Sequence, residues 1–448
     1  MYRDMTRGGI TRSLLLFALP MMAGSLLQQL YNVADTLIVG RALGRDALAA
    51  VGSAFTLMTF LTSIFLGLAM GAGALFAICI GRGDMASLRR AAALALCLIG
   101  AVTAVLTGLV YALLSPVLRF LQIPEALLGD MGGYLRIIFA GLTATFLYNY
   151  FACLLRSAGN SAAPLWFLGG AALLNVGLDL LFVLVCRWGV SGVAAATVIA
   201  QYTAGLGLAV YALRRCRELL PRREDFRFDR RTLRELLDLS LLTCVQQSAM
   251  NFGILLVQRL VDSFGPVVMA AFAAAVKIDA FAYLPVQDFG NAFSTFAAQN
   301  YGAGQPERLR QGLRHATAVS AAFSCAVAAL VVLFARPLMG LFVQAGETEV
   351  IAAGVLYLRI EGAFYAGIGC LFLLYGFYRA VQRPGMSVVL TVISLGTRVA
   401  LAYLLSATPL GVTGIWLSVP IGWALADAIG IGYYLKKSAC KNDEAMVR

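Results

Sequence analysis

Two polar residues stand inside the apolar segment LLNVGLDLLF, which covers residues 173–182: Asn175 and Asp179. At about 100° per residue, positions four apart lie on one face of a helix, so the amide and the carboxylate point the same way. No counter-charge lies nearby in the sequence. An unpaired charge near the centre of a bilayer costs at least about 2.5 kcal/mol, so we expect this carboxylate to be protonated or to bind a cation.

A second polar group lies in the first long apolar segment, at residues 13–39. Gln28, Asn32 and Asp35 are spaced i, i+4 and i+7, which places them within about 60° on a helical wheel. Pro20 lies about two turns earlier, where it removes a helix hydrogen bond and predicts a hinge. The first segment therefore carries both a second carboxylate and a candidate hinge.

Thr197 of the sixth segment completes a candidate cation site with Asp35, Asn175 and Asp179. No basic residue lies within the first, fifth or sixth segment, so neither carboxylate has a fixed partner. Such a pair suits a proton or a bound Na⁺, with amide and hydroxyl oxygens completing the shell. The amide and hydroxyl groups alone would equally suit contacts between helices. We predict coupling to H⁺ or Na⁺, and Na⁺ at Asp35, Asn175 and Asp179 is the one metal site expected.

The segments that carry these residues predict an all-α integral membrane protein. Of 448 residues, 60% are hydrophobic and 13% are charged, whereas a soluble domain has about 25% charged residues. Long apolar runs recur, each meeting the roughly 20 residues that a span requires. We predict twelve transmembrane helices, at residues 13–39, 48–80, 92–121, 132–156, 163–186, 190–213, 235–262, 266–300, 315–343, 350–380, 386–408 and 411–435.

The distribution of basic residues predicts the orientation. Of 35 lysines and arginines, 25 fall in segments assigned to the cytoplasm, seven fall in outside loops, and three fall within spans, namely Arg259, Lys277 and Arg398. The linker at residues 214–234 alone holds nine arginines. Because basic segments stay on the cytoplasmic side of a membrane, we predict that both termini are cytoplasmic. The expected location of the protein is the plasma (inner) membrane. We therefore interpret the net charge of +12 as a signal of membrane orientation. Contact between the basic residues and anionic lipid is the lesser alternative, and we expect no binding of nucleic acid.

The chain repeats itself at a separation near 223 residues. YLRI occurs at 134–137 and again at 357–360, and Arg156 maps onto Arg379. Arginine-rich loops follow spans two and eight, so two six-span halves share one orientation and form parallel lobes around a central cleft. The predicted division is an N-terminal lobe at 1–213, a basic cytoplasmic linker at 214–234, a C-terminal lobe at 235–435 and a cytoplasmic tail at 436–448.

The second lobe does not copy the acidic site of the first. At the offset of 223 residues, Asn175 maps onto Arg398 and Asp179 onto Ala402. The second lobe has a polar set of its own. Lys277, Asp288 and Asn291 share one helix face, and Asp279 of the same helix points away from that face. Glu361 and Arg398 complete the set. With Gln28 and Asn32, these residues are candidates to line a substrate cleft. Both charge signs are present, so mutual neutralisation between packed helices is the alternative.

The sequence carries no enzyme motif. It contains no Walker loop, paired-histidine zinc motif or GxSxG elbow, and its nine scattered cysteines form no CxxC pair. The single histidine, His315, lies near the start of span nine, where we interpret it as interfacial. We expect no enzyme activity and no cofactor, and an ion gradient is the expected energy source.

These residues together resemble the multidrug and toxic compound extrusion (MATE) family over essentially the whole chain. The resemblance rests on the two six-helix halves, on Pro20, Gln28 and Asp35, and on the Asn175-x-x-x-Asp179 pair. It also rests on the glycine-bearing loops after spans two and eight. The segment KIDAFAYLPVQDFGNAFSTFAAQNYGAG is similar to bacterial members in particular.

The resemblance implies antiport of amphipathic, often cationic compounds against H⁺ or Na⁺ by alternating access, with bending of span one at Pro20. The ion site that it implies matches Asp35, Asn175, Asp179 and Thr197. One departure concerns the second lobe. Members with an acidic site there carry a glutamate inside span seven, where this chain reads CVQQSAMNFG, so only Glu361 represents that pattern.

Two other classes compete with multidrug antiport. A lipid-linked-precursor flippase of the same wider superfamily would use Arg259, Lys277 and Arg398 as anion contacts. A membrane-embedded enzyme would need a catalytic cluster, against which the lone histidine argues. For the transporter, the expected partners are small-molecule substrates and the lipid bilayer, and we expect a monomer.

The orientation can be tested by cysteine labelling in intact cells. A cysteine in the linker, introduced as Glu224→Cys, should react with an impermeant thiol reagent only after the cells are opened, because the linker lies inside. Arg187→Cys, in a loop assigned to the outside, is the positive control. Labelling of the linker in intact cells would contradict the predicted orientation.

Overall fold

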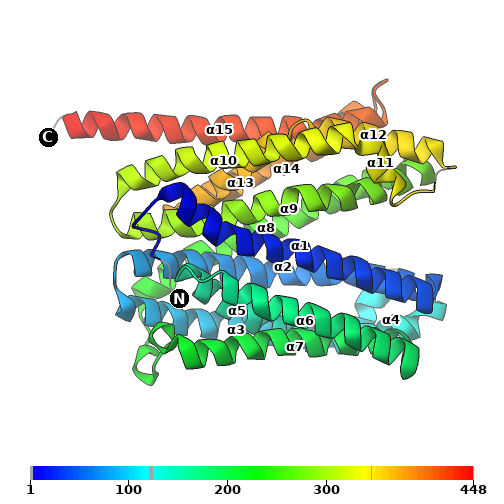
Figure 1. The fold of residues 1–448 in the computed structure, drawn as a ribbon, viewed down its shortest axis with the longest axis horizontal. Coiled ribbons are helices and arrows are strands. Elements are labelled where there is room, and N and C mark those ends of the chain that lie inside the picture. The colour runs from blue at the N-terminus through cyan, green and yellow to red at the C-terminus, as the bar shows by residue number, and fades with distance from the viewer. Residues whose placement is uncertain (1–3, 121–124, 345, 447–448) are drawn as a thin grey trace.

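The computed structural model describes residues 4–120, 125–344 and 346–446. Their helices run side by side along one axis, and no strand occurs among them (Figure 1). Eleven helices are long and apolar enough to cross a membrane. A twelfth span is formed by α12 (Thr348–Gly362) and α13 (Tyr365–Ala380), which are bent by 51° at a short break. The predicted all-α membrane fold is confirmed.

The first half of the chain contributes six of these spans. Its elements are α1 (Ile10–Ala42), α2 (Arg45–Gly81), α3 (Met85–Phe120), α4 (Glu125–Ala140), α5 (Leu142–Ser157), α6 (Ala162–Leu180), the π-helix η1 (Leu181–Val185) and α7 (Gly189–Arg215). α4 and α5 form one span, interrupted at Gly141. The π-helix begins two residues after Asp179, and such π segments occur frequently at functional sites.

The second half contributes the other six spans. Its elements are η2 (Arg217–Leu219), η3 (Arg223–Asp225), α8 (Arg230–Asp262), α9 (Pro266–Gly302), α10 (Pro306–Leu333), α11 (Ala335–Gly340), α12, α13, α14 (Pro384–Ser406) and α15 (Val412–Met446). The ninth span begins earlier than the predicted residue 315. His315 therefore lies inside α10, where its Nδ1 is 2.8 Å from the Thr11 hydroxyl.

The basic linker is docked on the first lobe. Arg89 Nε lies 3.3 Å from Asp225 Oδ2, and an Arg90 nitrogen lies 3.7 Å from Asp229 Oδ2. Asp229 also caps α8, because its carboxylate accepts hydrogen bonds from the hydroxyl and backbone N–H of Thr232. The Thr232 hydroxyl lowers the pKa of Asp229, so this cap stays ionised. The linker and the start of α3 are thus held together.

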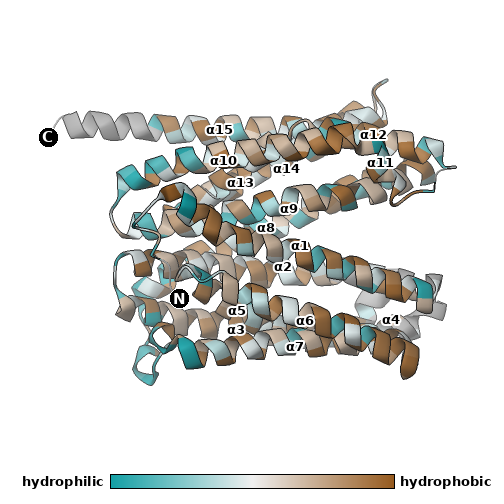
Figure 2. Cartoon of the chain, in the orientation of Figure 1, coloured by the Kyte–Doolittle hydropathy of each residue, from teal (hydrophilic) through white to brown (hydrophobic). Residues whose placement is uncertain are grey.

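The two halves form two groups of helices that meet along one face (Figure 1). α1 packs on α9, and α2 packs on α8, so the first two spans of one half contact the first two spans of the other. One apolar core crosses this junction, since Phe17 of α1 is buried in the same cluster as Phe293 of α9 and Trp423 of α15. Figure 2 shows hydrophilic residues concentrated in the loops at the left-hand end.

Close backbone contact seals the lobes against each other at that end. A Cβ at Gly81 of α2 would overlap the backbone oxygen of Gln299 in α9, and a Cβ at Gly302 of α9 would overlap the backbone oxygen of Ile78 in α2. Only glycine allows the two helices to approach this closely. The start of α1 and the end of α15 lie at this same end of the molecule (Figure 1).

Residues 4–9, the N-terminal strap, cross from the first lobe onto the second. Met5 is fully buried, and its N–H donates to Gln299 Oε1 at 3.1 Å. The guanidinium of Arg308 donates to the backbone oxygens of Met5, Arg7 and Gly8 at 2.8–3.3 Å. The strap therefore adds hydrogen bonds and apolar contact to the sealed end.

We expect Gly302→Ala to weaken this seal. The added methyl group meets backbone, which cannot rotate away, and such overpacking costs about 1–3 kcal/mol. The thermal midpoint of the purified protein in detergent should fall. Gly108→Ala in α3 is the matched control, because a Cβ there meets no atom within 4 Å and helical alanine is favoured. Equal midpoints for the two variants would contradict the tight contact.

Candidate functional site

The first lobe brings together the four residues of the predicted cation site, from α1, α6 and α7. The carboxyl groups of Asp35 and Asp179 lie within hydrogen-bonding distance of each other. Asp179 is 0% exposed and Asn175 is 2% exposed, so the α6 side of the site is sealed from solvent. One buried oxygen of each carboxyl group, Oδ1, has no hydrogen-bond partner in the described residues.

Asn175 connects the carboxyl pair to α7. With its amide oriented to satisfy both neighbours, the nitrogen donates to Asp179 Oδ2 at 3.2 Å and the oxygen accepts from the Thr197 backbone N–H at 3.3 Å. The Thr197 hydroxyl lies 3.5 Å from the same amide and donates to the Val193 backbone oxygen at 3.0 Å. The spacing of four residues on α6 therefore brings the two side chains together, with Asn175 contacting α7 and Asp179 contacting Asp35 of α1.

Within the part of the chain that the structure describes, no basic side chain compensates the charges of the acidic pair. Tyr31 and Tyr134 lie near both carboxyl groups, and no basic side chain is among the charged groups that act on either one. Two adjacent carboxylates cannot both stay ionised in an apolar setting. The arrangement can therefore hold one shared proton, or one small monovalent cation on oxygen ligands, with the two unpartnered oxygens available to it.

The second lobe contains a buried polar cluster with a different charge balance. The Tyr365 hydroxyl donates to Asp279 Oδ1 at 2.5 Å, and the Tyr357 hydroxyl donates to Glu361 Oε2 at 2.9 Å. Arg398 lies close enough to interact with both acids. As predicted, Asp279 does not share the face of Lys277, Asp288 and Asn291. It is buried in this second cluster, whose partners the sequence did not indicate. A fixed guanidinium thus stands where the first lobe has Asn175.

Two of the three predicted mid-span basic residues lie outside any such cluster. Lys277 of α9 is exposed, on the opposite side from the buried Asp279. Arg259 is exposed in the last turn of α8. Lys277 shares a helix face with Asp288 and Asn291 but not their surroundings. The reason is that α9 packs against several helices, namely α1, α2, α12 and α13. The anion site proposed for a flippase from Arg259, Lys277 and Arg398 is therefore not assembled.

A third polar group joins the lobes through α9. Ser25 of α1 donates to Asp288 Oδ2, and Asp288 also contacts Asn291 and interacts with Arg156 of α5. Asn291 Oδ1 accepts a hydrogen bond of 3.1 Å from Arg379 of α13, which is buried. Asp288 and Asn291 therefore lie together, as their spacing predicts. The arginines that marked the sequence repeat both belong to this group.

The remaining predicted residues stand apart from the acidic pair. Gln28 is exposed on α1, and the Asn32 amide donates to Gln29 of its own helix at 3.1 Å. Pro20 lies within α1, which continues unbroken through it. Of the polar stripe on α1, only Asp35 enters the cation site.

Sequence reasoning missed several buried groups. Asp427 of α15 lies beside Cys370 of α13, and its Oδ1 has no partner among the described residues. The tyrosines at the two acidic clusters were also missed, although a signal was present. Tyr134 and Tyr357 are the first residues of the two YLRI copies, and each lies beside the carboxyl groups of its own lobe. The repeated motif thus marks both sites.

Nothing in the described part of the chain resembles a transition-metal centre. No group of three or more histidine, cysteine, aspartate or glutamate side chains is placed there to hold a metal ion. The cysteines that the structure describes are all free thiols. The chemistry available at the buried sites is therefore that of protons, hard cations and ion pairs.

Twelve spans in two lobes, with polar sites buried in each lobe, define a multi-pass membrane transporter. A family model described as MatE matches residues 20–181 and again residues 243–404, so the two matches begin 223 residues apart. This spacing equals the offset of the YLRI repeat. The chain belongs to the MatE (multidrug and toxic compound extrusion) family.

Relatives and solved structures agree with this assignment. The chain is 30% identical over 443 residues to the probable multidrug resistance protein YpnP of Bacillus subtilis, covering 96% of each chain. It is 26% identical over 443 residues to a protein of Shewanella oneidensis named FAD transporter, covering 96% of this chain and 95% of the relative. The fold is similar to that of a MOP superfamily transporter from Pyrococcus furiosus, with a TM-score of 0.92, 24% identity and 98% of each chain covered.

The second-lobe cluster predicts a stability effect at Arg398. In Arg398→Gln, Asp279 and Glu361 lose the nearby cation, so the free energy of unfolding should fall by on the order of 2 kcal/mol, the scale of a charge interaction at an effective dielectric constant of about 20. The double variant Arg398→Gln/Glu361→Gln should regain part of that loss. Additive losses in thermal unfolding would show that the cluster is not coupled.

Proposed function

We propose that the protein exports amphipathic, cationic compounds from the cytoplasm in exchange for H⁺ or Na⁺, which binds at Asp35, Asn175, Asp179 and Thr197. The observation that carries the proposal is the contact between the buried carboxyl group of Asp179 and the partly buried carboxyl group of Asp35, with no basic group among the charges that act on them. Such a pair binds a cation because its own charge is costly in the membrane interior. Family membership and the relatives named as multidrug resistance proteins support export.

A proton fits the geometry better than Na⁺. Two carboxyl oxygens within hydrogen-bonding distance can share a proton directly, whereas Na⁺ would need several oxygen ligands around a central position. Two carboxyl groups this close take up and release protons as a coupled pair and not as independent sites. H⁺ is therefore the favoured coupling ion, and Na⁺ is the alternative that the same experiment separates.

The geometry suggests how ion binding is coupled to lobe movement. Asp35 belongs to α1, which also packs on α9 of the other lobe, whereas Asp179 belongs to α6. A bound proton lets the two carboxyl groups touch, and its loss makes them repel each other. Ion release would therefore push α1 away from α6, and α1 transmits that shift to the second lobe. Pro20, which lies between the strap and Asp35, is the expected bending point.

The sealed end is proposed to face the cytoplasm, because it holds the arginine-rich linker and both chain ends. The conformation described is then closed toward the cytoplasm. Ser25 and Asp288 form one of the contacts that must break when this end opens to admit substrate. The protein is proposed to act as a monomer in the plasma membrane, with both termini inside.

Export of a phosphate-bearing compound is the second candidate. Arg379 is buried with hydrogen bonds only to Ser294 and Asn291, and Arg156 has an unpartnered Nε in the same region. Two guanidinium groups beside the single carboxylate of Asp288 leave positive charge that an anionic substrate would neutralise. One relative is named FAD transporter. Competition between a fluorescent cation and FAD in the same transport assay separates the two candidates.

The coupling residues can be tested in proteoliposomes with the external pH and Na⁺ varied independently. Asp35→Asn and Asp179→Asn keep side-chain size but remove the titratable charge, so gradient-driven transport should fall to the level of liposomes without protein. Proton release on substrate binding should vanish in both variants. A response to pH but not to Na⁺ in wild type would identify H⁺ as the coupling ion.

Asp262→Asn is the matched control for these two variants. Asp262 is an exposed carboxylate at the end of α8, where it accepts a hydrogen bond from Gln258. This variant should retain wild-type transport and proton release. If Asp35→Asn and Asp179→Asn also keep wild-type ion responses, the acidic pair is structural and the proposed coupling is wrong.

A further inference from the structure

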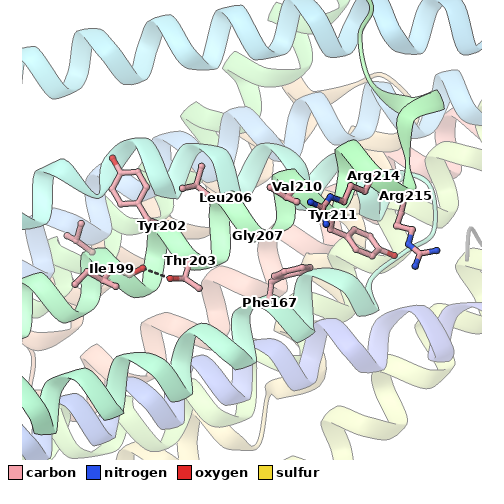
Figure 3. A pocket seen from close by; sticks show the side chains of 11 residues that line it. Phe167, Ile199, Tyr202, Thr203, Leu206, Gly207, Val210, Tyr211, Arg214 and Arg215 are labelled. Atoms are coloured by element: carbon pink, nitrogen blue, oxygen red, sulfur yellow. Dashed lines mark hydrogen bonds between the residues drawn. The ribbon is translucent and has the colours of Figure 1, made fainter.

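A groove runs between α6 and α7 on the first lobe, and its lining includes none of Asp35, Asn175, Asp179 and Thr197. Its volume is about 780 Å³, and Figure 3 shows the side chains that line it. Phe167 comes from α6, and every other lining residue comes from α7, between Val198 and Arg215. α7 lies at the edge of the first lobe farthest from the second lobe (Figure 1). The groove therefore opens toward lipid.

The middle of the groove is apolar. Ile199, Leu206 and Val210 are between 42% and 50% exposed, on a helix that crosses the membrane. Gly207 keeps the groove open beside Phe167, because a Cβ at Gly207 would lie 2.8 Å from atoms of the Phe167 ring. From Ile199 to Arg215 the helix rises about 24 Å, which is most of the roughly 30 Å hydrocarbon thickness.

The polar groups of the groove divide into two kinds. Those along its length are engaged within the protein: the Tyr202 hydroxyl donates to the Ala140 backbone oxygen at 2.9 Å, the Thr203 hydroxyl donates to the Ile199 backbone oxygen at 2.8 Å, and the Tyr211 hydroxyl accepts from Asn160 at 3.3 Å. Arg214 and Arg215, at one end, have no hydrogen bond or ion pair within the described ranges.

We propose that this groove binds an anionic phospholipid, with its phosphate on Arg214 and Arg215 and an acyl chain along Leu206 and Gly207. The charge of the groove identifies the ligand. An apolar groove that ends in two free guanidinium groups is complementary to a molecule with an apolar tail and an anionic head group. The arginines lie at the end of α7 that continues into the basic linker. The lipid therefore comes from the membrane leaflet on the linker side.

The groove also joins the two helices that carry most of the cation site. Asn175 and Asp179 stand on α6, Thr197 stands on α7, and Val198 lines the groove directly after Thr197. A lipid seated between Phe167 and α7 contacts both helices outside the site. Its position places it to support the packing of α6 on α7, which the Asn175–Thr197 contact also requires.

Binding can be measured on the purified full-length protein by native mass spectrometry and by thermal shift, with phosphatidylglycerol and phosphatidylcholine of identical acyl chains. Phosphatidylglycerol should bind and raise the thermal midpoint, and phosphatidylcholine should not. Arg214→Gln/Arg215→Gln should weaken phosphatidylglycerol binding about thirtyfold, which corresponds to about 1 kcal/mol for each arginine near the membrane surface. Equal binding of both lipids, or unchanged binding by this double variant, would overturn the proposal.

Two further variants keep the test specific. Arg222→Gln/Arg223→Gln removes the same charge from the exposed linker and should change phosphatidylglycerol affinity less than threefold. Gly207→Leu fills the groove while keeping Arg214 and Arg215, and it should weaken binding at least tenfold. An unaltered thermal midpoint without lipid shows that each variant is folded.

Other occupants give distinct results. If glycerol 3-phosphate raises the thermal midpoint as much as phosphatidylglycerol does, the arginines bind a soluble anion and the lipid proposal is overturned. If the protein is a dimer in detergent and Gly207→Leu dissociates that dimer, the groove binds a second copy of the chain. This result would also overturn the proposal.

Discussion

A carboxyl group in the interior of a membrane must be neutralised, and the architecture of the first lobe follows from that constraint. Asp179 is fully buried on α6, and the charged group that acts on it is a second acid, Asp35, not a base. The two acids can stay in contact only when a cation lies between or beside them. α1, α6 and α7 are therefore held together by a contact whose stability depends on an ion from outside the protein. The lobe is stable as a unit, yet its central contact is reversible.

The second lobe solves the same physical problem with a permanent partner. Asp279 and Glu361 are each paired with a tyrosine, and Arg398 supplies positive charge at the position that Asn175 occupies in the first lobe. A tethered cation does not exchange with solvent, so the charge of one of these two acids is compensated without an ion from outside the protein. The duplicated halves share helices, orientation and the YLRI tyrosine. They differ in whether the neutralising charge is covalently attached.

Much of this could be predicted from the sequence, and the failures have a common physical origin. The spans, the repeat offset and the common face of Asn175 and Asp179 follow from local periodicity, which depends on the helix alone. A helical wheel separates Asp279 from the face of Lys277 and Asp288, but it cannot name the partners of any of the three, because it gives only an angle about one axis. It does not specify which neighbouring helix lies at that angle and depth. Lys277 and Asp288 share a face of α9, yet one is exposed and the other contacts α1.

The N-terminal strap makes the beginning of the chain part of the seal between the lobes. Met5 belongs to the apolar core that crosses the junction between the lobes, and Arg308 of the second lobe hydrogen-bonds to the backbone of Met5 and Arg7. If this end of the molecule opens, the strap has to leave its pocket or travel with one lobe. A protein domain or affinity tag fused ahead of the strap would hang from a moving part, whereas one fused after α15 would extend from the end of a helix. A fusion before the strap is therefore expected to disturb the seal between the lobes more than a fusion after α15 does.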